Sequence, residues 1–248
     1  MKIDTASASR GIAWYGEGWR IVRSQFGMWI LLSLIFWGIN LILNFIPFIG
    51  PLALSFITPA LTGGLFKAAR DCKNGQYLSL NYISIAFKDP ATRNATLTLG
   101  AINIGFSLAA ALIMIVALSG GGVFMLLHKP NLMAILHVAA GAGLVSLLLI
   151  SMLALLLAMA MLYAVPIVML TDIEPIEAMK LSIRASGKNM LSLSVYGVVY
   201  IFLVLVSVLT FGLGLIILMP ITVGSLYSSY EDIFSHDSQE PAEIPYQA

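Results

Sequence analysis

The sequence contains few charged residues: Asp, Glu, Lys and Arg make up 10% of its 248 positions. A soluble domain carries roughly a quarter charged residues, because it needs them to cover its surface. Since 59% of the residues are hydrophobic and the mean hydropathy is +0.94, we expect lipid rather than water to surround most of the chain. The formal net charge of +1 argues against a nucleic-acid partner.

The sequence also lacks the usual motifs for catalysis or cofactor binding. The single cysteine, Cys72, excludes an internal disulfide, and we place it in a charged loop without partners for a zinc or redox site. His128 and His137 have no nearby carboxylate or thiolate, so they make a poor metal site. A P-loop and a serine–histidine–acid arrangement are both missing. We therefore expect no metal, no cofactor and no catalytic residue.

Six apolar stretches are long enough to cross a bilayer, which takes roughly 20 residues. The first two and the last two are joined by short connections rich in Gly or Pro, so each pair is expected to form a tight hairpin. The middle pair has a longer connection, and residues 132–142 either begin the fourth helix or form a separate interfacial helix. The expected spans are residues 28–45, 51–69, 95–118, 142–168, 190–210 and 213–230.

Basic residues indicate the orientation of these spans. Twelve of the 13 Lys and Arg residues fall on one side of the six-span arrangement, and only Lys129 falls on the other. Because cytoplasmic loops collect basic residues, we expect both termini to be cytoplasmic. The central third of each span contains no ionisable residue, whereas a proton-coupled transporter usually has one.

Two segments of the chain resemble each other, which predicts an internal repeat. Residues 19–71 align without gaps on residues 180–232, and a proline, a glycine and an aspartate fall at equivalent places. Both segments enter the membrane from the same side, so the repeat is parallel rather than inverted. The matched residues are Pro59 and Pro220, Gly63 and Gly224, and Asp71 and Asp232.

A short amphipathic segment precedes each of the three hairpins. Each segment places three apolar residues on one helical face, such as Trp19, Val22 and Phe26 before the first hairpin. A basic amphipathic helix beside a span is expected to lie in the headgroup layer, although any basic loop helix next to a bilayer has this pattern. The residues expected to contact lipid headgroups are Trp19, Arg20, Arg23, Lys180, Arg184 and Lys188.

Small residues and prolines mark where we expect the helices to pack. In lipid, helices associate where small residues let their backbones approach, and Pro59 and Pro220 are expected to bend their helices. Such bends either gate a pathway or are paired kinks left by a duplication. The expected packing residues are Pro59, Ala60, Gly63, Gly64, Ala68, Gly105, Pro220, Gly224 and Ser228.

Polar residues within the spans allow a second interpretation. They either bind a polar solute in a cavity between helices or hydrogen-bond across helices, for under about 2 kcal/mol each. A cavity would make the protein a small-solute permease or channel. The residues concerned are Asn40, Asn44, Thr62 and Asn103.

Four motifs carry a resemblance to a known family: "GEGWRIVRSQFGMWILL", "IPFIGPLALSFITPALTGGLFKAARD", "DIEPIEAMKLSIRASGKNMLSLSVYG" and "GLGLIILMPITVGSLYSSYEDIF". With them the chain resembles uncharacterised proteobacterial multi-pass inner-membrane proteins and, more distantly, the membrane domain of some glycerophosphodiester phosphodiesterases. The resemblance covers about residues 14–72 and 166–234, and residues 91–165 match only in hydrophobicity. It implies a six-helix bundle in a bacterial inner membrane and no particular reaction. Glu231 stands where that family has a basic residue.

Together these patterns predict an all-α fold: an integral membrane bundle of six transmembrane helices, arranged as three hairpins, with short interfacial amphipathic helices before each hairpin. Residues 1–13 are expected to form a flexible N-terminus and residues 14–234 the six-helix domain. Residues 235–248 are acidic and polar, so we expect a disordered tail.

The function we expect is that of a non-enzymatic integral inner-membrane protein, either a scaffold or a lipid- or partner-binding bundle. Its partners would be the bilayer, anionic phospholipid, and a second copy of the chain or another membrane protein. One alternative is the small-solute permease or channel. The other is a membrane-surface lipid-modifying enzyme, which would need carboxylates such as Asp71 and Glu177 to converge in a cytoplasmic cleft.

Overall fold

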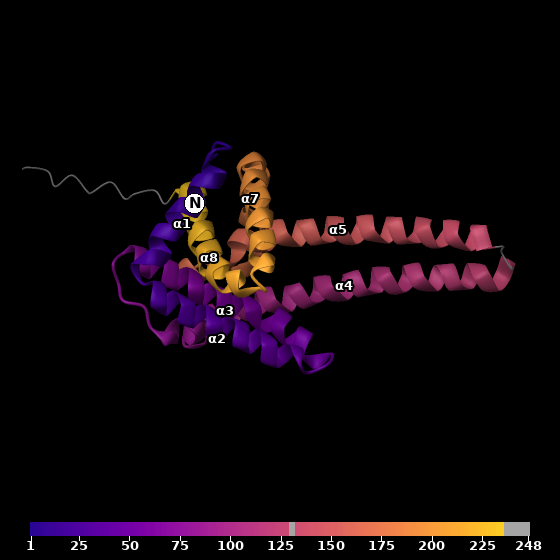
Figure 1. Cartoon of the computed structure of the whole chain (residues 1–248), viewed down its shortest axis with the longest axis horizontal. Helices are drawn as coiled ribbons and strands as arrows, with labels where there is room; N and C mark the ends of the chain where they lie inside the picture. Colours follow the sequence, from indigo (N-terminus) through magenta and orange to yellow (C-terminus); the bar gives the residue numbers. More distant parts are fainter. Residues whose placement is uncertain (129–131, 236–248) are drawn as a thin grey trace, which may run out of the picture.

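The computed structural model describes residues 1–128 and 132–235, which are almost entirely helical. Six long helices form three antiparallel hairpins, as predicted (Figure 1). Each has an apolar segment long enough to cross a bilayer, so the protein is an all-α, multi-pass membrane bundle. The helices are α2 (Phe26–Asn44), α3 (Ile49–Lys73), α4 (Pro90–His128), α5 (Leu132–Leu170), α7 (Met190–Leu209) and α8 (Leu213–Ile233).

The middle hairpin is longer than we predicted. Helices α4 and α5 have 39 residues each, and Figure 1 shows them extending well beyond the other helices. At 1.5 Å per residue each is about 58 Å long, nearly twice the thickness of a hydrocarbon core. Residues 132–142 belong to α5, so they begin the fourth spanning helix and do not form a separate interfacial helix. Lys129, predicted to lie on the outer side, is outside the described residues.

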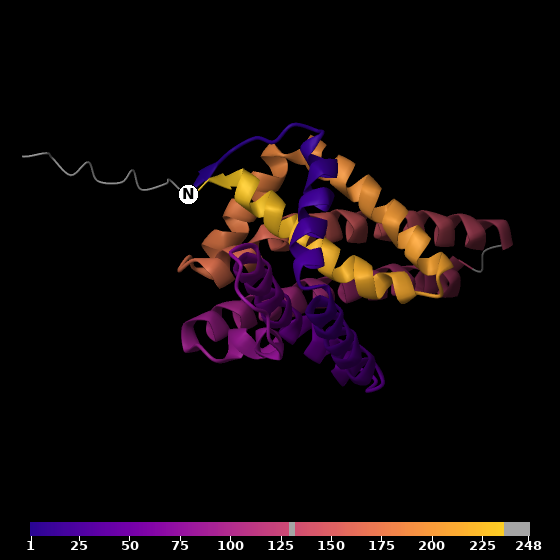
Figure 2. The same ribbon diagram turned by 60° about the vertical axis from the view of Figure 1, so that its left-hand side comes forward.

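Three short helices precede the hairpins: α1 (Arg10–Ser24), the 3-10 helix η1 (Leu80–Phe87) and α6 (Pro175–Lys188). Helix η1 packs mainly against α3, and α6 packs mainly against α5. Each therefore covers the second spanning helix of the hairpin before it. Helix α1 packs mainly against α8, the last spanning helix. Each hairpin therefore has one short helix packed on its second spanning helix. The α2–α3 and α7–α8 turns point away from the N-terminus (Figure 2).

Glycines permit the close approach of the short helices to the spans. A Cβ atom added to Gly18 of α1 would lie 2.5 Å from the backbone nitrogen of Ser225, and one added to Gly224 would lie 3.0 Å from the Cα of Gly18. A Cβ atom added to Gly64 would overlap the carbonyl oxygen of Tyr82 in η1. Any larger residue at these positions would force the helices apart.

A serine joins α6 to α5. The Ser182 hydroxyl accepts a hydrogen bond from the backbone N–H of Tyr163 at 3.0 Å and donates one to the carbonyl oxygen of Met159 at 2.6 Å. A regular α-helix would join these two backbone groups directly, because they are four residues apart. The Ser182 side chain is therefore inserted into the backbone hydrogen bonds of α5, three residues before Pro166.

Eight of the nine residues predicted to pack between helices are buried, and Gly105 is the exception. It is exposed, and a Cβ atom added there would meet nothing within 4 Å. The eight buried residues are Pro59, Ala60, Gly63, Gly64, Ala68, Pro220, Gly224 and Ser228.

The N-terminus is attached to the bundle, whereas we predicted a flexible segment over residues 1–13. Strand β1 (Lys2–Ile3) pairs antiparallel with β2 (Phe234–Ser235). The Ala6 N–H then donates a hydrogen bond to the Asn189 side-chain oxygen at 2.7 Å, and α1 begins at Arg10. Ser235, predicted to belong to the disordered tail, is thus in a strand, and residues 236–248 lie outside the described part of the chain.

Candidate functional site

The six residues predicted to contact lipid headgroups are all exposed, and most of the charged ones are unpaired. In the described part of the chain, Arg23, Arg184 and Lys188 have no carboxylate within 4.0 Å. Arg20 makes only a 3.4 Å hydrogen bond to the carbonyl oxygen of Gly16, and Lys180 pairs with Glu177 at 3.3 Å. The exposed set is Trp19, Arg20, Arg23, Lys180, Arg184 and Lys188.

The apolar face of α1, in contrast, is covered by protein. Trp14 and Val22 are fully buried and Ile21 nearly so, because this face packs against α8 and α7. We predicted that Val22 would share a lipid-facing side with Trp19 and Phe26. Only Trp19 and Phe26 are exposed, with their rings edge-to-face at 6.1 Å.

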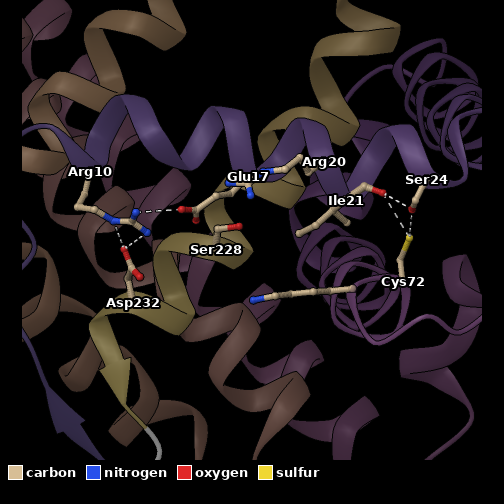
Figure 3. Close-up of a pocket in the computed structure, with 9 residues that line it drawn as sticks. Arg10, Glu17, Arg20, Ile21, Ser24, Cys72, Ser228 and Asp232 are labelled. Atoms are coloured by element: carbon tan, nitrogen blue, oxygen red, sulfur yellow. Dashed lines mark hydrogen bonds and ion pairs between the residues drawn. The ribbon is translucent and has the colours of Figure 1, made fainter.

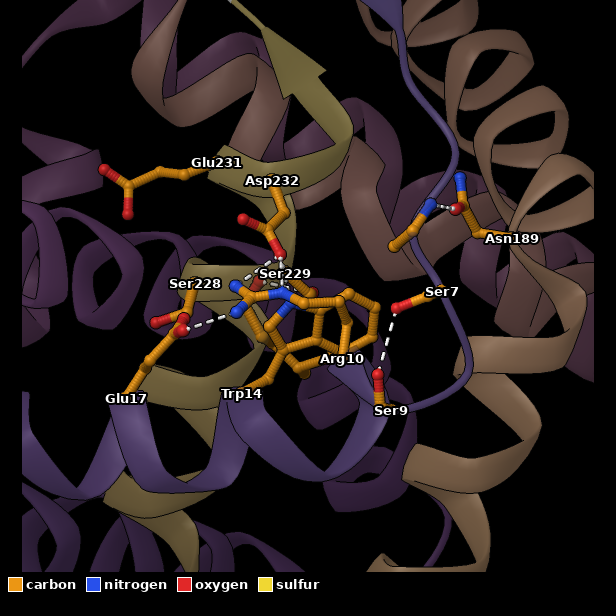
Figure 4. A network of polar contacts seen from close by, with 12 residues as sticks. Ser7, Ser9, Arg10, Trp14, Glu17, Asn189, Ser228, Ser229, Glu231 and Asp232 are labelled. Carbon is orange, nitrogen blue, oxygen red and sulfur yellow. Dashed lines mark hydrogen bonds and ion pairs between the residues drawn. The ribbon is translucent and has the colours of Figure 1, made fainter.

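The C-terminal end of α8 is bound to α1 by a charged network (Figure 4). Asp232 accepts hydrogen bonds from the Trp14 indole at 2.7 Å and from the Arg10 guanidinium at 2.5 Å. Arg10 also pairs with Glu17 at 2.9 Å. Partial burial alone would lower the pKa of Arg10, but its bonds to Asp232 and Glu17 outweigh burial and raise the pKa.

Asp71, which the sequence aligns with Asp232, makes an equivalent contact at the end of α3. It is 6% exposed and accepts a 2.8 Å hydrogen bond from the Tyr82 hydroxyl of η1. Lys67 and Arg70 pair with it at 3.2 and 3.3 Å. Burial and the bond to Asp71 raise the pKa of Tyr82 to about 12. Each aspartate therefore fastens a short helix to the end of a spanning helix.

The two carboxylates that an enzyme was predicted to use are in different settings. Asp71 is surrounded by the three partners just described, whereas Glu177 is exposed on α6 and pairs with Lys180. Among the described residues, no group of three or more His, Cys, Asp and Glu side chains could hold a metal ion. The side chains of His128 and His137 lie outside the part of the structure that can be described.

A polar pocket of about 490 Å³ lies between α1, α3 and α8 (Figure 3). At one end is Cys72, which lies in the last turn of α3, 5% exposed, and not in a charged loop as predicted. Its thiol contacts the Ser24 hydroxyl at 3.2 Å and the carbonyl oxygen of Ile21 at 3.4 Å. The lining residues are Arg10, Glu17, Arg20, Ile21, Ser24, Cys72, Lys73, Ser228 and Asp232.

A second pocket, of about 470 Å³, lies between α2, α3, α5, α7 and α8. We call it the apolar groove, because its lining is almost entirely hydrophobic. Of the residues predicted to line a polar cavity, only Thr62 belongs to it, and the Thr62 hydroxyl already donates to the carbonyl oxygen of Thr58 at 2.8 Å. The polar cavity that a permease for small polar solutes would need is therefore not at this place.

The three asparagines predicted to line a cavity make ordinary helix contacts instead. The Asn40 amide donates to the carbonyl oxygen of Phe36 at 2.9 Å, and that of Asn44 donates to Asn40 at 2.8 Å. The Asn103 amide crosses from α4 to the carbonyl oxygen of Ser55 in α3 at 3.3 Å. Only the Asn103 bond runs across helices, as the packing interpretation expected. The bonds of Asn40 and Asn44 stay within α2.

Comparison with known proteins places the chain in a family. A family model described as "Domain of unknown function (DUF7847)" matches residues 18–241. The chain belongs to this family. The match covers all six spanning helices, including residues 91–165, where our sequence comparison found only hydrophobicity. No curated protein and no solved structure matches the chain. The similarity to glycerophosphodiester phosphodiesterase membrane domains therefore stays a prediction.

Sequence reasoning missed two residues of the α1–α8 contact, Trp14 and Gly18. Gly11 and Gly18 are seven residues apart, so they lie on one face of α1. This spacing could have predicted a helix contact on that face of α1, because small residues on one face permit close helix approach. We interpreted the apolar face of α1 as a lipid contact and gave its glycines no role.

Proposed function

We propose that this member of the DUF7847 family is a non-catalytic, lipid-binding protein of a bacterial inner membrane. Helices α1 and α6 would contact anionic phospholipid headgroups on the cytoplasmic side. The main support is that four of the six exposed basic residues without a carboxylate partner in the described structure lie on these two helices: Arg20, Arg23, Arg184 and Lys188. The other two, Lys88 and Arg93, lie between α3 and α4 and at the start of α4. Six other basic residues do have carboxylate partners: Lys2, Arg10, Lys67, Arg70, Lys73 and Lys180.

The attachment of α1 and α6 to the spans supports this role. Helix α1 is fixed to α8 through Gly18 and the Asp232 network, and α6 is fixed to α5 through Ser182. Their basic side chains are thus held beside the ends of spanning helices. Each basic residue near an anionic surface contributes about 1 kcal/mol of attraction, so the four together would produce a marked preference for anionic lipid.

The two alternative functions have less support. A permease for polar solutes would need a polar path. The groove between the spans is apolar, and neither Asn40 nor Asn44 lines it. A surface enzyme would need a carboxylate free to act on a substrate, but Asp71 already has three partners. We therefore favour lipid binding.

The test compares anionic and zwitterionic lipid as stabilisers of the purified protein. Phosphatidylglycerol or phosphatidylcholine is added to the protein in a non-ionic detergent, and unfolding is followed by the intrinsic fluorescence of the four tryptophans. We expect phosphatidylglycerol to raise the Tm of the natural protein more than phosphatidylcholine does. In the variant Arg23→Glu, Arg184→Glu, Lys188→Glu this preference should disappear, because the attraction becomes repulsion.

The matched control is Arg23→Lys, Arg184→Lys, Lys188→Arg, which keeps every charge and should behave like the natural protein. If the charge-reversed protein does not fold, glutamine at the same three positions removes the charge with less disturbance. The proposal is wrong if charge removal or reversal leaves the preference for phosphatidylglycerol unchanged.

A further inference from the structure

We infer that the apolar groove is a binding site for one acyl chain of a bilayer lipid, separate from the headgroup contacts proposed for α1 and α6. The groove has a rim and a floor. Its rim includes the exposed residues Trp37, Ala158 and Tyr200. Its floor is formed by buried residues from three spanning helices, α3, α5 and α8: Phe66, Val165, Leu218 and Val223.

The depth of the groove indicates where its occupant comes from. Trp37 is 11 residues from the first residue of α2 (37 minus 26), and Tyr200 is 10 residues from the first residue of α7 (200 minus 190). At 1.5 Å per residue, both lie about 15 Å from the end of a spanning helix, which is half the thickness of a hydrocarbon core. The groove therefore opens at a depth where bilayer lipids present only their acyl chains.

The chemistry of the lining agrees with an apolar occupant. The two threonine hydroxyls in the lining donate within their own helices, Thr62 to Thr58 at 2.8 Å and Thr222 to Leu218 at 2.8 Å. Neither hydroxyl needs a polar ligand as hydrogen-bond acceptor. An apolar cavity does not hold water well, and an empty one forfeits the dispersion contacts of its walls. An acyl chain restores those contacts.

The shape of the lining favours a flexible occupant. Met161 of α5 and Met219 of α8 both line the groove, and methionine side chains adapt to irregular apolar surfaces. The volume of about 470 Å³ falls within the range of pockets that hold small ligands. The rim residues Trp37 and Tyr200 are flanked along α2 and α7 by exposed apolar residues, so a chain can enter sideways from the bilayer. These flanking residues are Leu34, Leu41, Val198 and Ile201.

The experiment uses a photoactivatable phosphatidylcholine with a diazirine in the middle of one acyl chain. The full protein is reconstituted in phosphatidylcholine containing increasing fractions of this probe, irradiated and digested, and labelled peptides are identified by mass spectrometry. We expect labelling of the groove peptides around Met161 and Met219 to reach a plateau as the fraction of probe in the bilayer rises. Labelling of the exposed α4 residues Leu108 and Leu112, which contact bulk lipid, should rise in proportion to the probe.

A filled groove provides the decisive comparison. Ala158→Phe places a ring at the rim, whereas Ala109→Phe makes the same change at an exposed position of α4 outside the groove. We expect Ala158→Phe to lower groove labelling about tenfold and Ala109→Phe to leave it unchanged. Thr222→Leu is a second filling variant, for use if Ala158→Phe does not fold. Equal groove labelling in the filled and control proteins, or groove labelling that does not saturate, would overturn the inference.

The result can be separated from the test of the proposed function. The probe is zwitterionic, so it does not depend on the basic residues of α1 and α6. The charge-reversed variant should keep its groove labelling, and Ala158→Phe should keep its preference for phosphatidylglycerol. If groove labelling does not saturate but the preference for phosphatidylglycerol is present, only the acyl-chain site is rejected. If the preference is absent but groove labelling saturates, only the headgroup contact is rejected.

Discussion

The contact between α1 and α8 offers a sharp quantitative prediction, because one methyl group should disrupt it. In Gly18→Ala the new Cβ atom would lie 2.5 Å from the nitrogen of Ser225, 2.8 Å from the carbonyl oxygen of Ile221 and 2.9 Å from the Cα of Ser225. Favourable contacts between carbon atoms occur near 3.5–4.0 Å. All three neighbours are backbone atoms of α8, so the strain cannot be relieved by a side-chain rotation and the helices must separate.

The expected cost follows from two opposing effects. Overpacking typically destabilises by about 1–3 kcal/mol, while replacing glycine by alanine within a helix contributes about 0.5–1 kcal/mol of stability. Because three backbone atoms would lie under 3.0 Å from the new Cβ atom, we take the upper end of the overpacking range. The expected net loss is then about 2 kcal/mol in the free energy that holds α1 on the bundle. Because 1.4 kcal/mol corresponds to a factor of ten, α1 should detach about 30-fold more often.

Cys72 is a natural reporter of this detachment. It is buried beneath α1, against Ser24 and Ile21, so its reaction rate with a maleimide in detergent measures how often α1 opens. Gly16→Ala is the matched control, since its Cβ atom would meet nothing within 4 Å, and Gly224→Ala should be intermediate because its closest contact is 3.0 Å. Equal protection of Cys72 in Gly18→Ala and Gly16→Ala would refute this account of the α1–α8 contact.

Two further predictions concern the other attachments of the short segments. The pKa of Tyr82 is raised to about 12 in the folded protein, whereas unfolded tyrosine titrates near 10. The neutral Tyr82 hydroxyl should therefore contribute its full share to the free energy of unfolding below about pH 10. That contribution should be lost as the pH rises through about 12. The Tm measured by intrinsic fluorescence should fall over that range, and fall less in Tyr82→Phe; an equal fall in both proteins would contradict the assignment. Asn189→Ala removes the side-chain hydrogen bonds to Ala6 and Asp4, each worth about 1 kcal/mol, so hydrogen exchange in peptides covering residues 1–9 should become about 30-fold faster. Exchange in α3 peptides is the internal control, and an unchanged rate at the N-terminus would disprove the attachment.

Hydrophobicity was sufficient to find the spans, because the thickness of the bilayer limits the length of a spanning helix. The predicted ends agree with α2, α3, α7 and α8 to within a few residues. The long hairpin was missed because "SGGGV" has the composition of a loop, whereas the structure continues α4 through it to His128. Local propensity is a weak guide in an apolar setting, where an unpaired backbone group is costly and helix is favoured.

The roles of the short helices could not be read from their pattern alone. Amphipathicity shows that one face of α1 is covered, but the cover can be lipid or protein. Here it is protein at Trp14 and Val22, while Ile12 and Trp19 of the same helix stay exposed. The alignment of Asp71 with Asp232 did select two equivalent positions. Their partners, Tyr82 and Trp14, were not predictable, since Trp14 and Asp232 are 218 residues apart.

The proposed binding of anionic headgroups depends on the side of the membrane that α1 and α6 face. The most direct measurement is labelling of Arg23→Cys and Arg184→Cys, each in a Cys72→Ser background, with a membrane-impermeant maleimide applied to intact spheroplasts and to inverted inner-membrane vesicles. The account predicts that both positions react in inverted vesicles and are protected in spheroplasts, because the unpaired basic residues face the anionic cytoplasmic leaflet. Labelling of either position from outside intact spheroplasts would contradict it.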